Sequence, residues 1–162
     1  MANVNVLQMV RELERDYQAY VAEVQVLTAG LEQLAQELEH GEQRARRTQE
    51  ALRHVSGAIR CLPELIEPLM QVHRQLDGHL AQVERQLQEL GQLRAERLRQ
   101  RGQTLRRIRE VKAQIKALAD TISGYEFVAL PQDSSDEAEV EDEGALVDSN
   151  GKRARRLGSA AN

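Results

Sequence analysis

The 162-residue chain has very few aromatic residues, with one Phe, three Tyr and no Trp. A globular domain of this size normally uses several aromatic side chains to fill its core. Proline is also scarce, at three residues, whereas Leu, Gln, Glu, Arg and Ala dominate. This composition argues against most enzyme folds and is typical of long helices and coiled coils.

The chain also lacks the residue patterns that support catalysis or metal binding. Its single cysteine, Cys61, excludes an intramolecular disulfide, and its four histidines show no metal-ligand spacing. No glycine-rich phosphate loop, nucleophile motif or pair of carboxylates in a common pocket is recognisable. We therefore expect no enzymatic activity, no catalytic, cofactor-binding or metal-binding residues, no cofactor and no small-molecule substrate.

Long apolar runs are absent as well. No stretch approaches the eighteen apolar residues of a membrane-spanning helix, and the first residues do not resemble a secretory signal. We expect an intracellular protein in the cytoplasm, where association with the cytoskeleton is one option, or in the nucleus.

What the sequence does contain is a regular heptad repeat over its first third. Fifteen of seventeen consecutive positions with 4-3 spacing between residues 6 and 62 are apolar. The repeat predicts a first coiled-coil helix over 1–62, with a stripe broad enough to contact more than one helix. The stripe residues expected to bind partners are Val10, Leu13, Tyr17, Tyr20, Val24, Leu27, Leu31, Leu34 and Leu38.

Two prolines interrupt the helical pattern. Pro63 and Pro68, preceded by Ser56 and Gly57, predict a hinge or turn within 56–68. A second coiled-coil helix is expected over 63–124, with regular helix from about residue 66 to 123. Gly124 suits a left-handed helix cap.

The charge distribution favours a fold in which these two helices pair within one chain. Net charges are −5 over 1–40, +3 over 41–62, −3 over 63–93 and +7 over 94–119. Folding at the turn would bring each acidic block beside a basic one, so an antiparallel hairpin is preferred over a parallel dimer kinked at the prolines. The fold class is therefore all-α: a long antiparallel helical hairpin with a disordered acidic tail.

The Arg-rich segment 94–116 has two interpretations. It could be neutralised by the acidic first helix, or it could bind an acidic groove or phosphates on a partner. Its arginines lie on several helix faces and no aromatics are interleaved for base stacking. Internal neutralisation is preferred, and nucleic acid is not an expected partner.

The chemistry of the chain changes after Gly124. The segment YEFVAL, 125–130, is either a docking motif for a partner or a cap in which Tyr125 and Phe127 fold back over Val10, Tyr17 and Tyr20. Residues 131–162 form an acidic tail expected to be disordered, because it cannot bury enough apolar surface.

Two short patterns in the tail suggest regulation or targeting. Ser134 and Ser135 precede a dense acidic run within 134–143, which makes them candidate phosphorylation sites for an acid-directed kinase. The basic cluster of Lys152, Arg153, Arg155 and Arg156 resembles a nuclear-import signal.

The sequence as a whole predicts a non-enzymatic coiled-coil subunit. Such a chain would act as a scaffold, tether or adaptor in a larger assembly of the cytoskeletal, kinetochore-like or vesicle-tethering class, through helical partners or self-association. The alternative is a nuclear chaperone or chromatin-associated adaptor that uses its acidic tail against basic partners.

Overall fold

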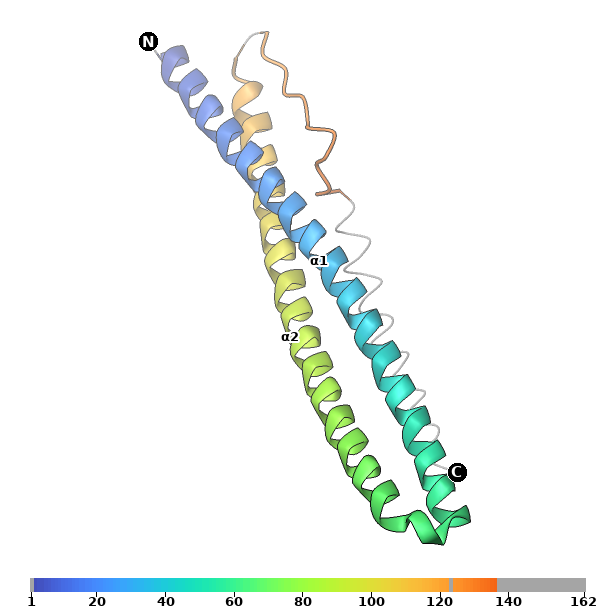
Figure 1. Cartoon of the computed structure of the whole chain (residues 1–162). Helices are drawn as coiled ribbons and strands as arrows, with labels where there is room; N and C mark the ends of the chain where they lie inside the picture. The colour runs from blue at the N-terminus through green and yellow to red at the C-terminus, as the bar shows by residue number, and fades with distance from the viewer. Residues whose placement is uncertain (1, 123, 137–162) are drawn as a thin grey trace, which may run out of the picture. The chain divides into compact units, whose positions relative to one another are not determined.

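The computed structural model describes residues 2–122 and 124–136. It contains helix α1, Ala2–Cys61, a short 3-10 helix, Pro63–Leu65, and helix α2, Ile66–Ala119. The two long helices pack antiparallel, and no strand occurs in these described ranges (Figure 1). The predicted all-α helical hairpin is confirmed.

The turn between the helices is shorter than the sequence suggested. Helix α1 continues through Ser56 and Gly57 to Cys61, so the hinge expected over 56–68 is confined to the residues around Pro63. Leu62 leaves the helical region, with φ −127° and ψ 71°, because the proline ring restricts the residue before it. Pro68 lies in the first turn of α2, where its missing N–H has no intrahelical partner to lose.

Contacts divide the chain into two units, each with its own stretch of α1 and α2. In the first unit, α1 up to Leu27 packs on α2 from Gln100 onward. Its buried core is one cluster, which contains Val10, Tyr17, Val21, Val24, Leu105, Ile108, Val111 and Ile115. The heptad stripe here is thus covered by the chain's own second helix.

The second unit, Thr28–Arg99, holds the turn and a thinner core. Its buried apolar side chains are Leu34, Ala45 and Val83. Thr48 is also buried, and its Oγ1 donates a hydrogen bond to the carbonyl of Arg44. Gly41 allows close approach of the helices, because a Cβ at this position would lie 2.5 Å from Cδ2 of Leu87. Residues 91–100 of α2 are all solvent-exposed, in agreement with the interruption of the apolar stripe by arginines.

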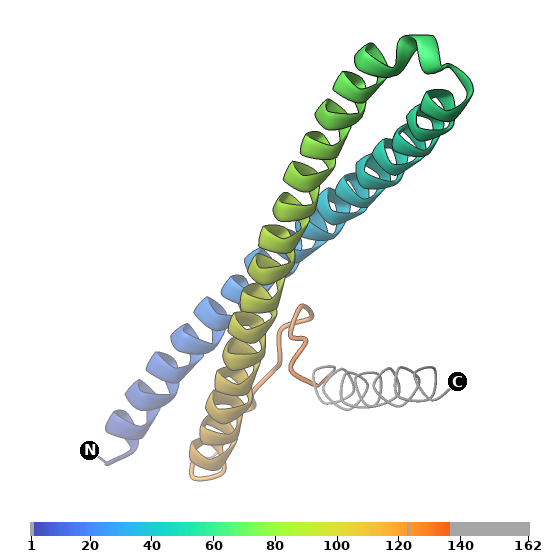
Figure 2. The same ribbon diagram turned by 90° about the horizontal axis from the view of Figure 1, so that it is seen from below.

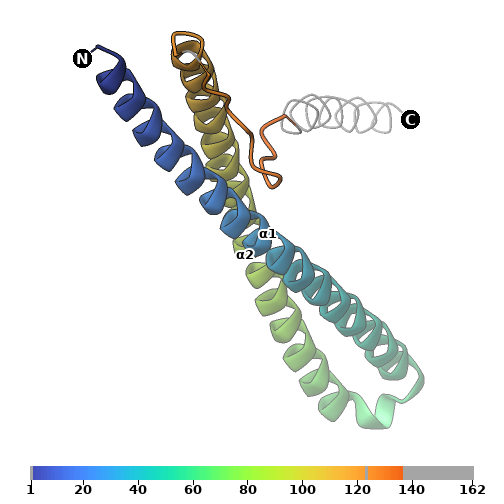
Figure 3. The same cartoon turned by 90° about the horizontal axis from the view of Figure 1, so that it is seen from above.

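Helix α2 ends at Ala119, four residues before the predicted boundary. The chain tightens there into successive turns, in which the N–H of Thr121 donates to Leu118 and that of Ile122 to Ala119. Gly124 follows with φ +79°, the left-handed conformation that its sequence position predicted. The chain then reverses and runs back beside the first unit as an extended segment (Figures 2 and 3).

Candidate functional site

The segment 125–136, called here the returning segment, packs on the core of the first unit. Tyr125, Phe127 and Leu130 lie against the buried cluster of α1 and α2. The ring of Phe127 meets Tyr17 edge-to-face, with centroids 5.3 Å apart and planes at 76°. Aromatic pairs with this geometry contribute about 0.5–1.5 kcal/mol beyond the area they bury. The structure thus shows the fold-back contact expected of a cap, and docking of a partner by Tyr125 and Phe127 stays a prediction.

The Tyr17 hydroxyl joins this apolar contact to a polar one. It donates a hydrogen bond to Oδ2 of Asp133 at 2.7 Å and accepts one from the backbone N–H of Leu130 at 3.0 Å. Burial is the main reason why the pKa of Tyr17 is raised to about 12, and the hydrogen bond to Asp133 is the second. The hydroxyl therefore stays protonated and can keep donating at any physiological pH.

Lys112 of α2 completes the polar cluster. Its ammonium lies 2.9 Å from Oδ2 of Asp133 and donates a hydrogen bond to Oγ of Ser135 at 3.1 Å. The N–H of Ser135 in turn donates to Oδ1 of Asp133 at 2.9 Å. Burial of Asp133 opposes its ionisation, but the bonds from Ser135, Lys112 and Tyr17 outweigh it and lower its pKa to about 2. We call Tyr17, Lys112, Asp133 and Ser135 the clasp.

The returning segment thus extends farther than the sequence indicated. Disorder was expected from residue 131 onward, yet Asp133 has a side chain only 2 % exposed and Ser135 is fully buried. The packing of these residues could not be predicted from the sequence, because a single carboxylate that pairs with a distant lysine leaves no periodic signal. Residues 137–162, with the rest of the acidic run and the basic cluster 152–156, lie outside the described residues.

The other predicted partner-binding residues lie in the interface between α1 and α2. Val10, Tyr17, Val24, Leu27 and Leu34 are at most 8 % exposed. The remaining four are partly buried, and they are Leu13, Tyr20, Leu31 and Leu38. Burial within the hairpin accounts for this stripe without a second protein, and partner binding by it stays a prediction.

Large apolar side chains are exposed near the turn instead. Within the second unit, five large apolar residues between 62 and 72 are exposed, and we call them the turn patch. Its members are Leu62 and Leu65, both 48 % exposed, Ile66 at 39 %, and Met70 and Val72 at 42 %. Ile66 and Met70 lie four residues apart on one face of α2, whereas Val72 follows Met70 by two residues and lies on another face. An amphipathic helix could lie on the surface around Ile66 and Met70.

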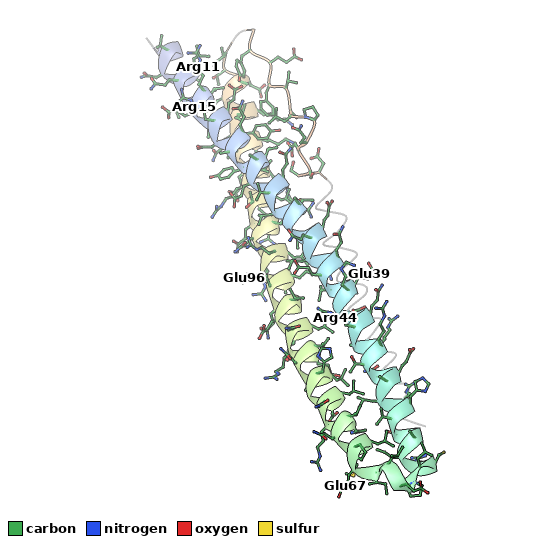
Figure 4. The ribbon with its side chains drawn as sticks, viewed as in Figure 1. Arg11, Arg15, Glu39, Arg44, Glu67 and Glu96 are labelled. Atoms are coloured by element: carbon green, nitrogen blue, oxygen red, sulfur yellow. The ribbon has the colours of Figure 1, made fainter. Side chains whose placement is uncertain are left out.

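Charged side chains are also exposed to solvent. The six charged residues labelled in Figure 4 are all solvent-exposed, and they are Arg11, Arg15, Glu39, Arg44, Glu67 and Glu96. In the Arg-rich segment 94–116, Arg107 lies over the ring of Tyr20, 6.0 Å from its centroid. Arg94, Arg97 and Arg99 make no direct ion pair with another described residue. The acidic first helix therefore does not neutralise these three arginines by direct ion pairs.

Among the hollows between the helices, one lies in each unit of the described chain. A hollow of about 530 Å³ in the first unit is lined by the apolar residues Met9, Leu13, Ala117 and Leu118 and by the polar residues Glu12, Asp16 and Gln114. One of about 320 Å³ in the second unit lies beside Gly41 and Leu87. Over residues 2–122 and 124–136, no three His, Cys, Asp or Glu side chains gather as metal ligands. No helix in those ranges is long and apolar enough to cross a bilayer.

Comparisons of the chain with models of protein families, with curated proteins and with solved structures find no significant match.

Proposed function

We propose that this chain is a non-enzymatic helical-hairpin subunit that scaffolds or tethers within a larger assembly of the cytoskeletal, kinetochore-like or vesicle-tethering class. The observation that supports it best is the turn patch, a group of large apolar side chains that stay exposed around the turn and are available to a partner. Because the hairpin buries much of its own heptad stripe, we assign partner binding to the turn patch.

The partner that suits this surface is a helix with an apolar stripe. Leu62, Ile66 and Met70 follow one another every four residues, and Leu65 lies beside Ile66. An apolar stripe of a partner helix could contact side chains at this spacing. The patch carries few charges of its own, with Glu64 and Glu67 within it and Arg60 just before it. Apolar contact, with a polar rim to select orientation, would therefore supply the binding free energy.

The test compares two double variants of the full-length, tagged chain in its native cell. Leu65→Gln with Met70→Gln alters the turn patch, whereas Val4→Gln with Val26→Gln alters two apolar side chains that are 68 % and 72 % exposed elsewhere. Subunit stoichiometries are measured by mass spectrometry after a moderate salt wash, and helical content by circular dichroism.

We expect stoichiometric helical subunits with the unaltered chain and with the control, and at least tenfold lower recovery with the turn-patch variant at unchanged helicity. Equal recovery with both variants, or recovery of the unaltered chain alone, would contradict the proposal. A chain truncated after residue 136 tests the alternative of a nuclear chaperone or chromatin-associated adaptor. Loss of histone-like basic partners on truncation, with the turn patch irrelevant, would favour that alternative.

A further inference from the structure

The hydroxyl of Ser135 occupies a site with no spare volume. The residue is 0 % exposed, its Oγ accepts the hydrogen bond from Lys112, and its N–H is engaged by Asp133. Ser134 beside it is only partly buried. A group attached to the Ser135 oxygen therefore has no space while the returning segment is docked.

We propose that Ser135 is a phosphorylation site, and that its phosphorylated form and the docked returning segment exclude each other. A phosphoryl group carries about −1.5 to −2 charges and three acceptor oxygens. The charge it would meet comes first from Asp133, whose Oδ2 already lies 2.9 Å from Lys112. Asp136 is a second carboxylate near the same ammonium, at 3.9 Å, but its side chain is 91 % exposed, so water screens its charge more than that of Asp133.

One lysine would then have to balance two carboxylates and a phosphate dianion. Like charges at such short range repel strongly where burial reduces screening by water. Release of the returning segment lets water solvate the phosphate and separates it from Asp133. Because Asp133 holds Tyr17, release also frees the Tyr17 hydroxyl and the Leu130 amide from their bonds.

The flanking sequence suits an acid-directed protein kinase. Asp136 and Glu137 follow Ser135 directly, and Glu139, Glu141 and Asp142 continue the acidic run. Such kinases bind acidic flanks through basic residues. In the transfer, Oγ of Ser135 attacks the γ-phosphorus of Mg-ATP, the bond to the β-phosphate oxygen breaks, ADP leaves, and the hydroxyl proton passes to the kinase's base.

Burial of Ser135 means that the kinase acts on the undocked form. The two equilibria are then linked, so a change that undocks the segment should speed phosphorylation, just as phosphorylation should undock it. Tyr17→Phe provides such a change far from Ser135 in sequence, and so leaves the kinase's recognition residues intact. This inference is independent of the turn patch and of the proposed function.

The experiment uses the full-length chain with Ser134→Ala, so that Ser135 is the remaining serine of the pair. Phosphate incorporation from ATP by an acid-directed serine kinase is mapped by mass spectrometry, and hydrogen exchange is followed at the amides of Leu130 and Asp133. We expect phosphorylation to raise both exchange rates at least about tenfold, with the Ile108 amide in the buried core unchanged. Incorporation should be faster in Tyr17→Phe and unaffected in Tyr20→Phe.

Two serine variants keep the test decisive whatever the kinase does. Ser135→Glu introduces charge and bulk and should raise the exchange of both amides, whereas Ser135→Ala removes one hydrogen bond and should change them only a few-fold. Slower or unchanged exchange after phosphorylation or in Ser135→Glu would overturn the proposal. So would the absence of phosphate at Ser135 in the Tyr17→Phe background.

Discussion

Removal of one oxygen atom from Tyr17 should open the returning segment without disturbing the helical core. Tyr17→Phe keeps the edge-to-face contact with Phe127 but deletes the hydroxyl that donates to Asp133 at 2.7 Å and accepts from Leu130 at 3.0 Å. The partners lose their bonds while remaining partly buried, so each loss costs more than a solvated hydrogen bond would.

The size of the effect follows from these two bonds. A hydrogen bond to a charged group contributes about 1.5–3 kcal/mol and a neutral one about 0.5–1.5 kcal/mol. Asp133 keeps Lys112 and Ser135, and water can reach the opened Leu130 amide, so the combined loss should fall near 2 kcal/mol. That corresponds to an approximately 30-fold larger population of the undocked segment.

Native-state hydrogen exchange measures this population directly. The amides to follow are those of Asp133, which donates to the Leu130 carbonyl at 3.1 Å, and Ser135, since neither bonds to Tyr17 itself. Tyr20→Phe is the matched control, because the Tyr20 hydroxyl makes no hydrogen bond with another described residue. Equal exchange in Tyr17→Phe and Tyr20→Phe would refute the idea that the clasp holds the segment.

Three further predictions concern pH and packing. Since the pKa of Asp133 is lowered in the folded state to about 2 from 3.8, its contribution of about 1–2 kcal/mol is present above pH 4 and is lost as pH falls from 4 to 2. The protection of the Ser135 amide, measured as its exchange rate relative to that of an unprotected amide at the same pH, should fall over that window, and constant protection would count against the clasp. Ile115→Ala, at a fully buried position, should lower the free energy of urea unfolding by about 2–5 kcal/mol, against less than about 1 kcal/mol for Leu98→Ala on the surface. Gly57→Ala should raise that free energy by up to about 1 kcal/mol, because nothing lies within 4 Å of the added methyl group, whereas Gly41→Ala should gain nothing because its methyl group displaces Leu87; equal gains at the two glycines would contradict the close approach.

The parts of the fold that could be predicted were those encoded in periodicity. The 4-3 spacing from residue 6 to 62 specified helix α1, and Pro63 located the turn because a proline restricts the residue before it. The alternation of charged blocks favoured the antiparallel arrangement that the structure shows. These signals are local or repeated many times, so a single sequence is sufficient to read them.

The clasp could not be predicted in the same way. Its four residues come from α1, α2 and the returning segment, and no repeat relates them. Asp133 and Ser135 also lie in a polar, acidic stretch whose composition indicates disorder. The one available signal was the sole Phe, Phe127, shortly after a glycine suited to reversing the chain. It was compatible with either a cap or a docking motif, and its spacing could not show how far a cap would continue.

Near the turn between the helices, the sequence indicated an interruption that α1 does not contain. Ser56 and Gly57 suggested an early end to α1, yet the helix continues through them to Cys61. Each costs the helix at most about 1 kcal/mol relative to alanine, which side-chain contacts along a long helix readily offset. Only the proline, which constrains the backbone directly, ended it.

The contact between Tyr17 and Asp133 also has a consequence for how the chain folds. The two residues are 116 positions apart in sequence, so their bond closes a loop that contains all of α2 and most of α1. Closing so long a loop costs entropy, and this cost is offset only if the two helices within the loop have already packed together. On the ribosome, Asp133 emerges after the whole of α2. Closure of the clasp should therefore be the last step of folding of the described chain, and a nascent chain stalled before it would leave the surface around Tyr17 open to chaperones.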